Sequence, residues 1–343
     1  MPLCICLQME AHMQKQVRYP IHKSTAGLLR SCGISPERVL KRAGMPVDLF
    51  DTENKGVTAQ QFFSLWEAIS DEIDDPKVVI EMAKAMARGP FIPAAFAFSC
   101  SPNIATGLKR KAIFKPLVAP IKLLVSETER HLILEIDVAE PNLDVPKCMA
   151  AFEMVYFLEM GRTFTGVDFL PVEVGVPELM EDQAVFDRHY GRKAVVTPLP
   201  RLTLTREDAY RPLISENPQL WAGFERELTR QLAEHQRAQS MATRVRNALL
   251  ELLPAGQASV DAVSDRLVTS RRSLQRHLSK EGQTFQSVLD DTRSDLSLHY
   301  LRQADMSVEE ISYLLAYRDP NSFYRAFQNW TGRTPAQMRA ELL

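Results

Sequence analysis

Apolar residues follow helical spacing in two stretches near the start of the chain, residues 24 to 43 and residues 58 to 88. The apolar positions of the second stretch fall on one helix face: Phe62, Trp66, Ile69 and Ile73. Thr58 stands just before them, where an N-cap is expected. We therefore predict amphipathic helices in both stretches.

Strand patterns follow these helices. Residues 119 to 125 favour a strand, and residues 131 to 138 alternate between apolar and polar side chains, which together predict a hairpin. A helix over residues 146 to 161 and a short alternating segment at residues 172 to 176 come next. This mixture lacks a regular strand-helix-strand order, so we expect an α+β domain over residues 24 to 205.

Residues 206 to 240 contain a charged helix with an apolar stripe in which every fourth residue is apolar: Leu220, Phe224, Leu228 and Leu232. Two interpretations are open, because such a stripe can form a dimer seam or can pack on its own domain. The segment from Ala238 to Thr243 is expected to be a linker.

The chain from residue 241 to residue 343 contains an internal repeat. Val260, Val263 and Leu267 have counterparts 48 residues later in Val308, Ile311 and Leu315. Leu274, Arg276 and Leu278 match Phe323, Arg325 and Phe327 at an offset of 49, and Gly282 matches Gly332 at 50. Each copy is predicted to form two short helices joined by a tight turn, so we expect an all-α domain with helix-turn-helix motifs at about residues 259–281 and 307–331.

The second helix of each motif has its apolar residues committed to a core, so its remaining side chains define the surface. These residues and their flanks are basic or carry amides and hydroxyls: Arg271, Arg272, Gln275, Arg276, Lys280, Arg318, Asn321, Ser322 and Arg325. Such side chains read base edges and contact phosphates, whereas ordinary solvated helix faces also contain Asp and Glu. We therefore expect these nine residues to bind double-stranded DNA.

One long helix is predicted between the motifs, from Phe285 to Gln303, because this stretch has apolar periodicity and no Pro or Gly. A helix of about twenty residues spans roughly 30 Å. This length suits two reading helices that enter successive major-groove segments, which lie about 34 Å apart.

Composition supports a folded, non-membrane protein. The chain has 41 Lys and Arg against 43 Asp and Glu, and 45% of its residues are hydrophobic. No stretch is long and apolar enough for a membrane span, and we expect no membrane partner. Five scattered cysteines do not suggest a disulfide framework, so a reducing cytoplasm is expected. Cys4, Cys6 and His12 are either incidental or part of a metal site; we expect no metal and no cofactor.

Catalytic signatures are absent from the sequence, which lacks paired glycine motifs, phosphate-binding loops and metal-binding histidine pairs. An enzyme is therefore not expected. A largely apolar small molecule in the α+β domain is one hypothesis, and its pocket residues would be aromatic: Phe91, Phe96, Phe98, Phe152 and Tyr156. The same aromatic residues are also typical of a plain core. The basic run Lys109 to Lys111 either meets a carboxylate ligand or lies in a solvated loop.

The segments SVDAVSDRL, SRRSLQRHLSKEG, SVEEISYLL and DPNSFYRAFQNWTGRTP resemble the DNA-binding domain of the AraC family of bacterial transcription regulators. The preceding domain is similar to the arabinose-type effector domain of one subgroup. The resemblance implies a homodimer that senses a small molecule of unidentified type, works with RNA polymerase at promoters and acts as an activator. Two alternatives remain: a regulator that is controlled by a partner protein, and an enzyme that carries a DNA-binding tail.

This chain departs from the family pattern at both motifs. Ser264 and Ser312 replace the usual Ala, and Val268 and Ala316 stand where Gly commonly turns the chain. Tyr317 replaces the usual Phe. If the two turn positions require a positive φ, each non-Gly residue there costs on the order of 1 kcal/mol.

Overall fold

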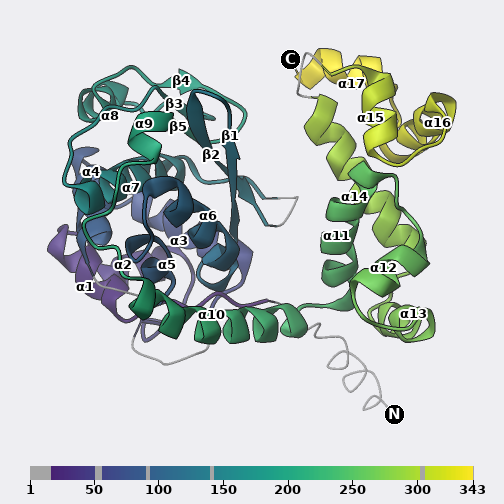
Figure 1. The fold of residues 1–343 in the computed structure, drawn as a ribbon, viewed down its shortest axis with the longest axis horizontal. Helices are drawn as coiled ribbons and strands as arrows, with labels where there is room; N and C mark the ends of the chain where they lie inside the picture. The colour runs from purple at the N-terminus through teal and green to yellow at the C-terminus, as the bar shows by residue number, and fades with distance from the viewer. Residues whose placement is uncertain (1–16, 51–55, 90–92, 140–142, 302–305, 343) are drawn as a thin grey trace, which may run out of the picture. The chain divides into compact units, whose positions relative to one another are not determined.

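The computed structural model describes residues 17–50, 56–89, 93–139, 143–301 and 306–342. These residues form two compact units, Val17–His235 and the chain from Gln236 onward, called here the N-terminal and C-terminal domains. The first is a mixture of helices and strands and the second is helical, so the predicted fold class is confirmed (Figure 1). None of the described helices combines the length and the apolar character that a membrane span requires.

The N-terminal domain contains a five-stranded sheet in the order β1-β2-β5-β3-β4. The strands are β1 (Ile121–Glu127), β2 (His131–Val138), β3 (Glu173–Val176), β4 (Val195–Val196) and β5 (Arg201–Thr205). The predicted hairpin is present, since β1 pairs antiparallel with β2 and Leu123 lies opposite Ile136. The remaining pairs are antiparallel except β3 with β4.

Along the chain, the helices of this domain precede the strands, lie between them and follow them. Their bounds are α1 (Ser24–Ser31), α2 (Pro36–Arg42), α3 (Ala59–Ser70), α4 (Lys77–Arg88), α5 (Pro93–Ser99), α6 (Ile104–Phe114), η3 (Lys115–Leu117), α7 (Lys147–Thr165), α8 (Gln183–Tyr190), α9 (Arg206–Ala209) and α10 (Pro218–Ala238). Each of the two predicted N-terminal helical stretches is divided in two: α3 ends at Ser70, and Pro76 is the N-cap of α4. Thr58 caps α3 in a capping box with Gln61, as its position predicted.

Helix α7 forms the centre of the N-terminal domain. Nearly all of its residues are buried, and it packs against α3, α4 and strands β3 and β5. A helix that is covered on every side has little amphipathic periodicity. Its buried Glu153 pairs with the buried Lys115 at 2.8 Å, so these two charges offset each other inside the core.

The apolar stripe of α10 packs on its own domain. Phe224 stacks on Phe96 with ring centroids 4.3 Å apart, Leu228 is buried, and Leu232 joins the same cluster. Leu220 stays 43% exposed. Of the two interpretations left open by the sequence, this packing favours docking within the domain.

The C-terminal domain consists of α11 (Met241–Leu252), η4 (Leu253–Ala255), α12 (Val260–Arg266), α13 (Arg271–Lys280), α14 (Phe285–Leu301), α15 (Val308–Leu314), α16 (Pro320–Thr331) and α17 (Pro335–Leu342). The expected linker over 238–243 is wrong at its end, because Ser240 caps α11 and the helix starts at Met241. The domain has two apolar clusters, one around Leu274 and Leu278 and the other around Phe323 and Phe327.

Candidate nucleic-acid interface

The first helix-turn-helix motif is built from α12 and α13. Ser259 and Ser270 cap the two helices, and their hydroxyls accept hydrogen bonds from the backbone N–H of Ala262 and Ser273 at 3.1 and 3.2 Å. Between the helices, Val268 has a φ of 51°. This left-handed residue reverses the chain quickly enough for both helices to share one core.

The outer face of α13 is cationic. Leu274 and Leu278 are fully buried, while the residues predicted to bind DNA are all exposed: Arg271, Arg272, Gln275, Arg276 and Lys280. Within the described residues, the only ion pair of α13 joins Arg271 to Asp261 at 3.8 Å, between two well-exposed side chains. A pair of this kind contributes little, so the face keeps its positive charge.

The second motif repeats this construction with α15 and α16. Ser307 caps α15 in a capping box with Glu310, and Asp319 caps α16 by accepting a 2.9 Å hydrogen bond from the Ser322 backbone. Hydrogen bonds from Ser322 hold the pKa of the Asp319 carboxyl below its usual value, so the cap stays ionised. Ala316 at the turn has a φ of 56°.

The predicted residues of the second motif lie in two settings. Arg318, Asn321 and Arg325 are exposed, whereas Ser322 is half-buried and its hydroxyl bonds to the Asp319 carboxylate at 2.7 Å. Tyr324 is also exposed on this face, at the position that corresponds to Gln275 of the first motif. The same 49-residue offset that pairs Arg276 with Arg325 would have identified it from the sequence.

A buried arginine of α14, Arg293, connects this helix to the second motif. From α14, Arg293 donates through Nε to the Leu315 carbonyl at 2.9 Å and through Nη2 to the Ala316 carbonyl at 3.1 Å. Its guanidinium also lies 4.2 Å from the centre of the Tyr317 ring. Arg293 therefore fixes the turn that aims α16. It has no counterpart within the repeat, so the sequence did not single it out.

Helix α14 has 17 residues, from Phe285 to Leu301, and is thus roughly 25 Å long. The predicted end at Gln303 lies outside the described residues. The second helices of the two motifs, α13 and α16, are called here the reading helices, and along the chain α14 lies between the two motifs.

Two models of known protein families match this chain. A family model described as the arabinose-binding domain of AraC transcription regulator, N-term, matches residues 33–213, which is more than half of the chain. The chain belongs to the AraC family of transcription regulators. A second model, described as a helix-turn-helix domain, matches residues 263–341 and covers both reading helices of this AraC-family protein.

Relatives of this AraC-family chain include regulators from two bacteria. The ornithine utilization regulator of Pseudomonas aeruginosa is 38% identical over 138 residues, which is 40% of each chain. The transcriptional regulator VirS of Mycobacterium tuberculosis is 24% identical over 91% of this chain and 93% of that one. The crystal structure of transcriptional regulator CdpR from Pseudomonas aeruginosa matches with a TM-score of 0.42 at 19% identity, over 93% of this chain and 97% of that one. The family assignment itself rests on the two models.

The described aromatic residues that were predicted to line a ligand pocket are packed into hydrophobic clusters of the N-terminal domain. Phe98 is fully buried, and Phe152 stacks on Tyr156 with an interplanar angle of 10°. Phe96 packs on α10, and Phe91 lies outside the described residues. This arrangement favours the core interpretation of these side chains.

The basic run at residues 109–111 is part of α6, so its interpretation as a solvated loop is wrong. Lys109 pairs with Glu127, and Arg110 lies 4.6 Å from the centre of the Trp221 ring. Lys111 is buried and donates to the Tyr156 hydroxyl at 3.0 Å. Burial lowers the pKa of Lys111 to about 8.

Metal ligation was an open alternative for the chain start, but Cys4, Cys6 and His12 lie outside the described residues. Among the residues that the structure does describe, no group of three or more His, Cys, Asp and Glu side chains is arranged to hold a metal ion.

Proposed function

We propose that this AraC-family regulator binds a bipartite DNA site, with α13 and α16 in two successive major-groove segments. One observation carries the proposal: two equivalent helices bury their apolar side chains and expose arginines and amides, and neither helix contains an Asp or a Glu. A polyanion is the partner that such paired faces fit.

Individual roles follow from position on the two helices. Arg276 and Arg325 are exposed at equivalent places and are proposed to make bidentate contacts with guanine. Gln275 and Asn321 offer amides that suit adenine. The residues nearer the helix ends are proposed to contact phosphates: Arg271, Arg272, Lys280, Arg318 and Ser322.

The regulatory part of the proposal concerns the N-terminal domain. We propose that a small molecule bound there changes promoter activity, and that the chain activates transcription as a homodimer with RNA polymerase in the bacterial cytoplasm. Catalysis is not part of this function. The sequence of this domain contains no catalytic signature, so the role proposed for it is binding.

Fluorescence anisotropy with the full chain and its selected DNA tests the proposal. Affinity should fall at least about 100-fold between roughly 50 and 200 mM salt, because several cations neutralise phosphates. The double variant Arg276→Ala/Arg325→Ala should bind selected and scrambled DNA alike, whereas Arg130→Ala, an exposed arginine of the N-terminal domain, should keep wild-type affinity and specificity. Salt-independent binding, or full specificity in the double variant, would overturn the proposal.

A further inference from the structure

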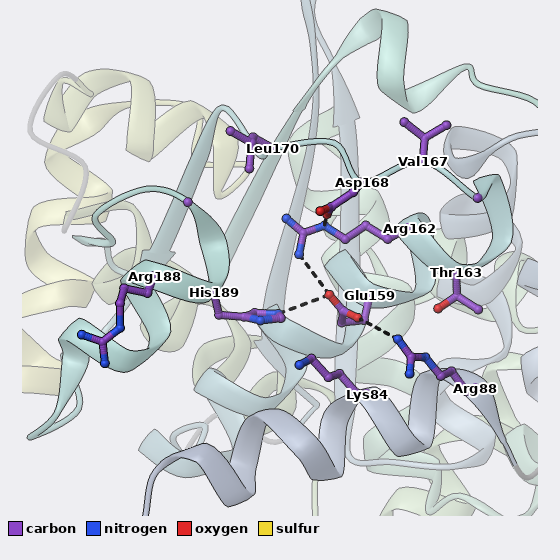
Figure 2. A pocket seen from close by; sticks show the side chains of 12 residues that line it. Lys84, Arg88, Glu159, Arg162, Thr163, Val167, Asp168, Leu170, Arg188 and His189 are labelled. Atoms are coloured by element: carbon purple, nitrogen blue, oxygen red, sulfur yellow. Dashed lines mark hydrogen bonds and ion pairs between the residues drawn. The ribbon is translucent and has the colours of Figure 1, made fainter.

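The N-terminal domain contains an open cleft of about 680 Å³, which is large enough for a small metabolite. Its walls come from the C-terminal ends of three helices and from the loop that follows α7 (Figure 2). The residues that carry charge there are Lys84 and Arg88 of α4, Glu159 and Arg162 of α7, Asp168, and Arg188 of α8. This cleft contains none of the aromatic residues that the sequence suggested for a pocket.

The floor of the cleft is a buried carboxylate, Glu159, whose side chain is only 6% exposed. Arg162 Nη1 lies 3.0 Å from Glu159 Oε1, and His189 Nε2 lies 3.3 Å from the same oxygen. Burial would raise the pKa of Glu159, but the adjacent His189 and the hydrogen-bonded Arg162 outweigh it and lower this pKa to about 2. The carboxylate is therefore ionised and already supplied with donors.

Arg162 also pairs with Asp168, the second carboxylate of the cleft. Its Nε lies 2.9 Å from Asp168 Oδ1, and it donates to the Phe169 carbonyl through Nε and Nη2. One arginine is thus engaged by both acidic side chains of the lining (Figure 2). Arg162 has a positioning role in the wall and has few donors left for a ligand.

Among the remaining cations of the described lining, only Arg88 pairs with a carboxylate of the cleft, and it does so at the longest distance. Arg88 reaches Glu159 only at 3.9 Å, and its side chain is well exposed. Lys84 pairs with Glu81 on the exposed side of its own helix. Arg188 is exposed and forms no ion pair with any residue that the structure describes. The lining therefore has four cationic side chains against two carboxylates.

Helix dipoles explain only part of this charge. A basic residue in a last turn is a common partner of a helix C-terminus, and α4, α7 and α8 each have at least one. That effect is local to each helix, so it does not require three ends to converge on one hollow. Nor does it require Lys84, which lies one turn before Arg88 on the same face of α4.

We propose that this cleft binds a small metabolite that carries two or more carboxylates, held by Arg88 and Arg188 with support from Lys84. Guanidinium groups bind carboxylates through paired hydrogen bonds. Phosphate sites usually add backbone N–H groups at a helix N-terminus, but this cleft faces helix C-termini, which attract no anion. The guanidinium groups must therefore hold the ligand by themselves, and their paired hydrogen bonds fit carboxylates. The proposal deepens the proposed function, because it assigns a chemical class to the effector of the regulator.

Isothermal titration of the full chain, in a buffer without phosphate or carboxylate and at fixed ionic strength, tests the proposal. The probes are citrate, malate, succinate and glutamate, with succinamide as the neutral counterpart and glycerol 3-phosphate as the phosphate probe. At least one polycarboxylate should bind saturably with a Kd below about 1 mM, and succinamide should not bind. Arg188→Gln and Arg88→Gln should each weaken binding at least about tenfold.

The matched control is Arg130→Gln, which removes an exposed arginine at the turn between β1 and β2, and it should leave the affinity within about twofold. Absence of binding by all four acids, binding of glycerol 3-phosphate alone, or equal losses in Arg188→Gln and Arg130→Gln would overturn the proposal. These titrations contain no DNA. Failure here with normal DNA binding would remove only the carboxylate site, and loss of DNA binding with normal titrations would remove only the DNA model.

Discussion

Val268 and Ala316 occupy equivalent turns 48 residues apart, and both have a left-handed backbone, with φ of 51° and 56°. Each backbone N–H bonds three residues back, Val268 to Asp265 at 3.1 Å and Ala316 to Tyr313 at 2.9 Å. The two motifs thus turn by the same local geometry with side chains that disfavour it.

Val268→Gly is expected to stabilise the C-terminal domain by about 1 kcal/mol, because a β-branched residue is strained at positive φ and Gly is not. The Val268 side chain is 93% exposed, so its loss removes little packing. Thr269→Gly, at a neighbouring position without a positive φ, is the control and should destabilise. Urea unfolding measures both variants, and equal destabilisation by the two would contradict the strain.

Both motifs also bury a serine hydroxyl, which lowers the stability of the domain. Ser264 and Ser312 are almost fully buried, and their Oγ atoms have no hydrogen-bond partner among the described residues. Replacing either by Ala should stabilise the domain by about 1 kcal/mol, since an unsatisfied polar group is removed. The control Ser279→Ala, on the exposed face of α13, measures the gain from helix propensity alone. Equal gains at buried and exposed positions would show that burial contributes nothing.

Arg293→Met is expected to destabilise the second motif by roughly 2 kcal/mol, because the Leu315 and Ala316 carbonyls lose their donor. Arg293→Lys keeps the charge but loses the two-pronged geometry, so it should fall between Met and wild type. Chemical unfolding gives the free energies, and footprinting on a two-part site should show weaker protection of the half bound by α16. Unchanged stability in both variants would exclude the positioning role of Arg293.

The buried Lys111 predicts a dependence of stability on pH. Its pKa falls from 10.5 to about 8 on folding, so between these values the unfolded chain binds more protons than the folded chain. Stability from this group therefore rises with pH across that window and is reduced at pH 7. Lys111→Met should be more stable than wild type at pH 7 by about 2 kcal/mol, and the difference should shrink by pH 9.5. A constant difference would show that Lys111 does not titrate abnormally.

The sequence predicted those parts of the fold that depend on neighbours along the chain. Both reading helices follow from the repeat, because caps such as Ser270 and Asp319 and apolar spacing act within a few residues. Arg293 at the Ala316 turn and the three helix ends around Glu159 were not predicted, because they require segments distant in sequence to approach one another. The aromatic stripe around Phe152 has the same spacing in a core as in a pocket, so its pattern cannot distinguish the two.

The same limit applied to helix ends. Residues 58 to 88 were expected to be helical, yet the chain leaves the helix after Ser70 and starts again at Lys77, and here Pro76 was a local signal for the division. Strand β5 was missed after Pro200, although Leu202 and Leu204 are buried and pair with β2. Its partners in β2 and β3 are distant in sequence, and only their approach selects a strand.

Arg276 and Arg325 are proposed to read different halves of one DNA site, and selection of preferred DNA sequences by single variants tests this most directly. Arg276→Ala and Arg325→Ala should each cost about 1 to 3 kcal/mol and relax preference at a few adjacent base pairs, in half-sites about one helical turn apart. Arg272→Ala, the phosphate control, should weaken all sequences alike and lower the salt slope by about one. Loss of preference at the same base pairs in both variants, or at none, would contradict the bipartite reading of DNA by α13 and α16.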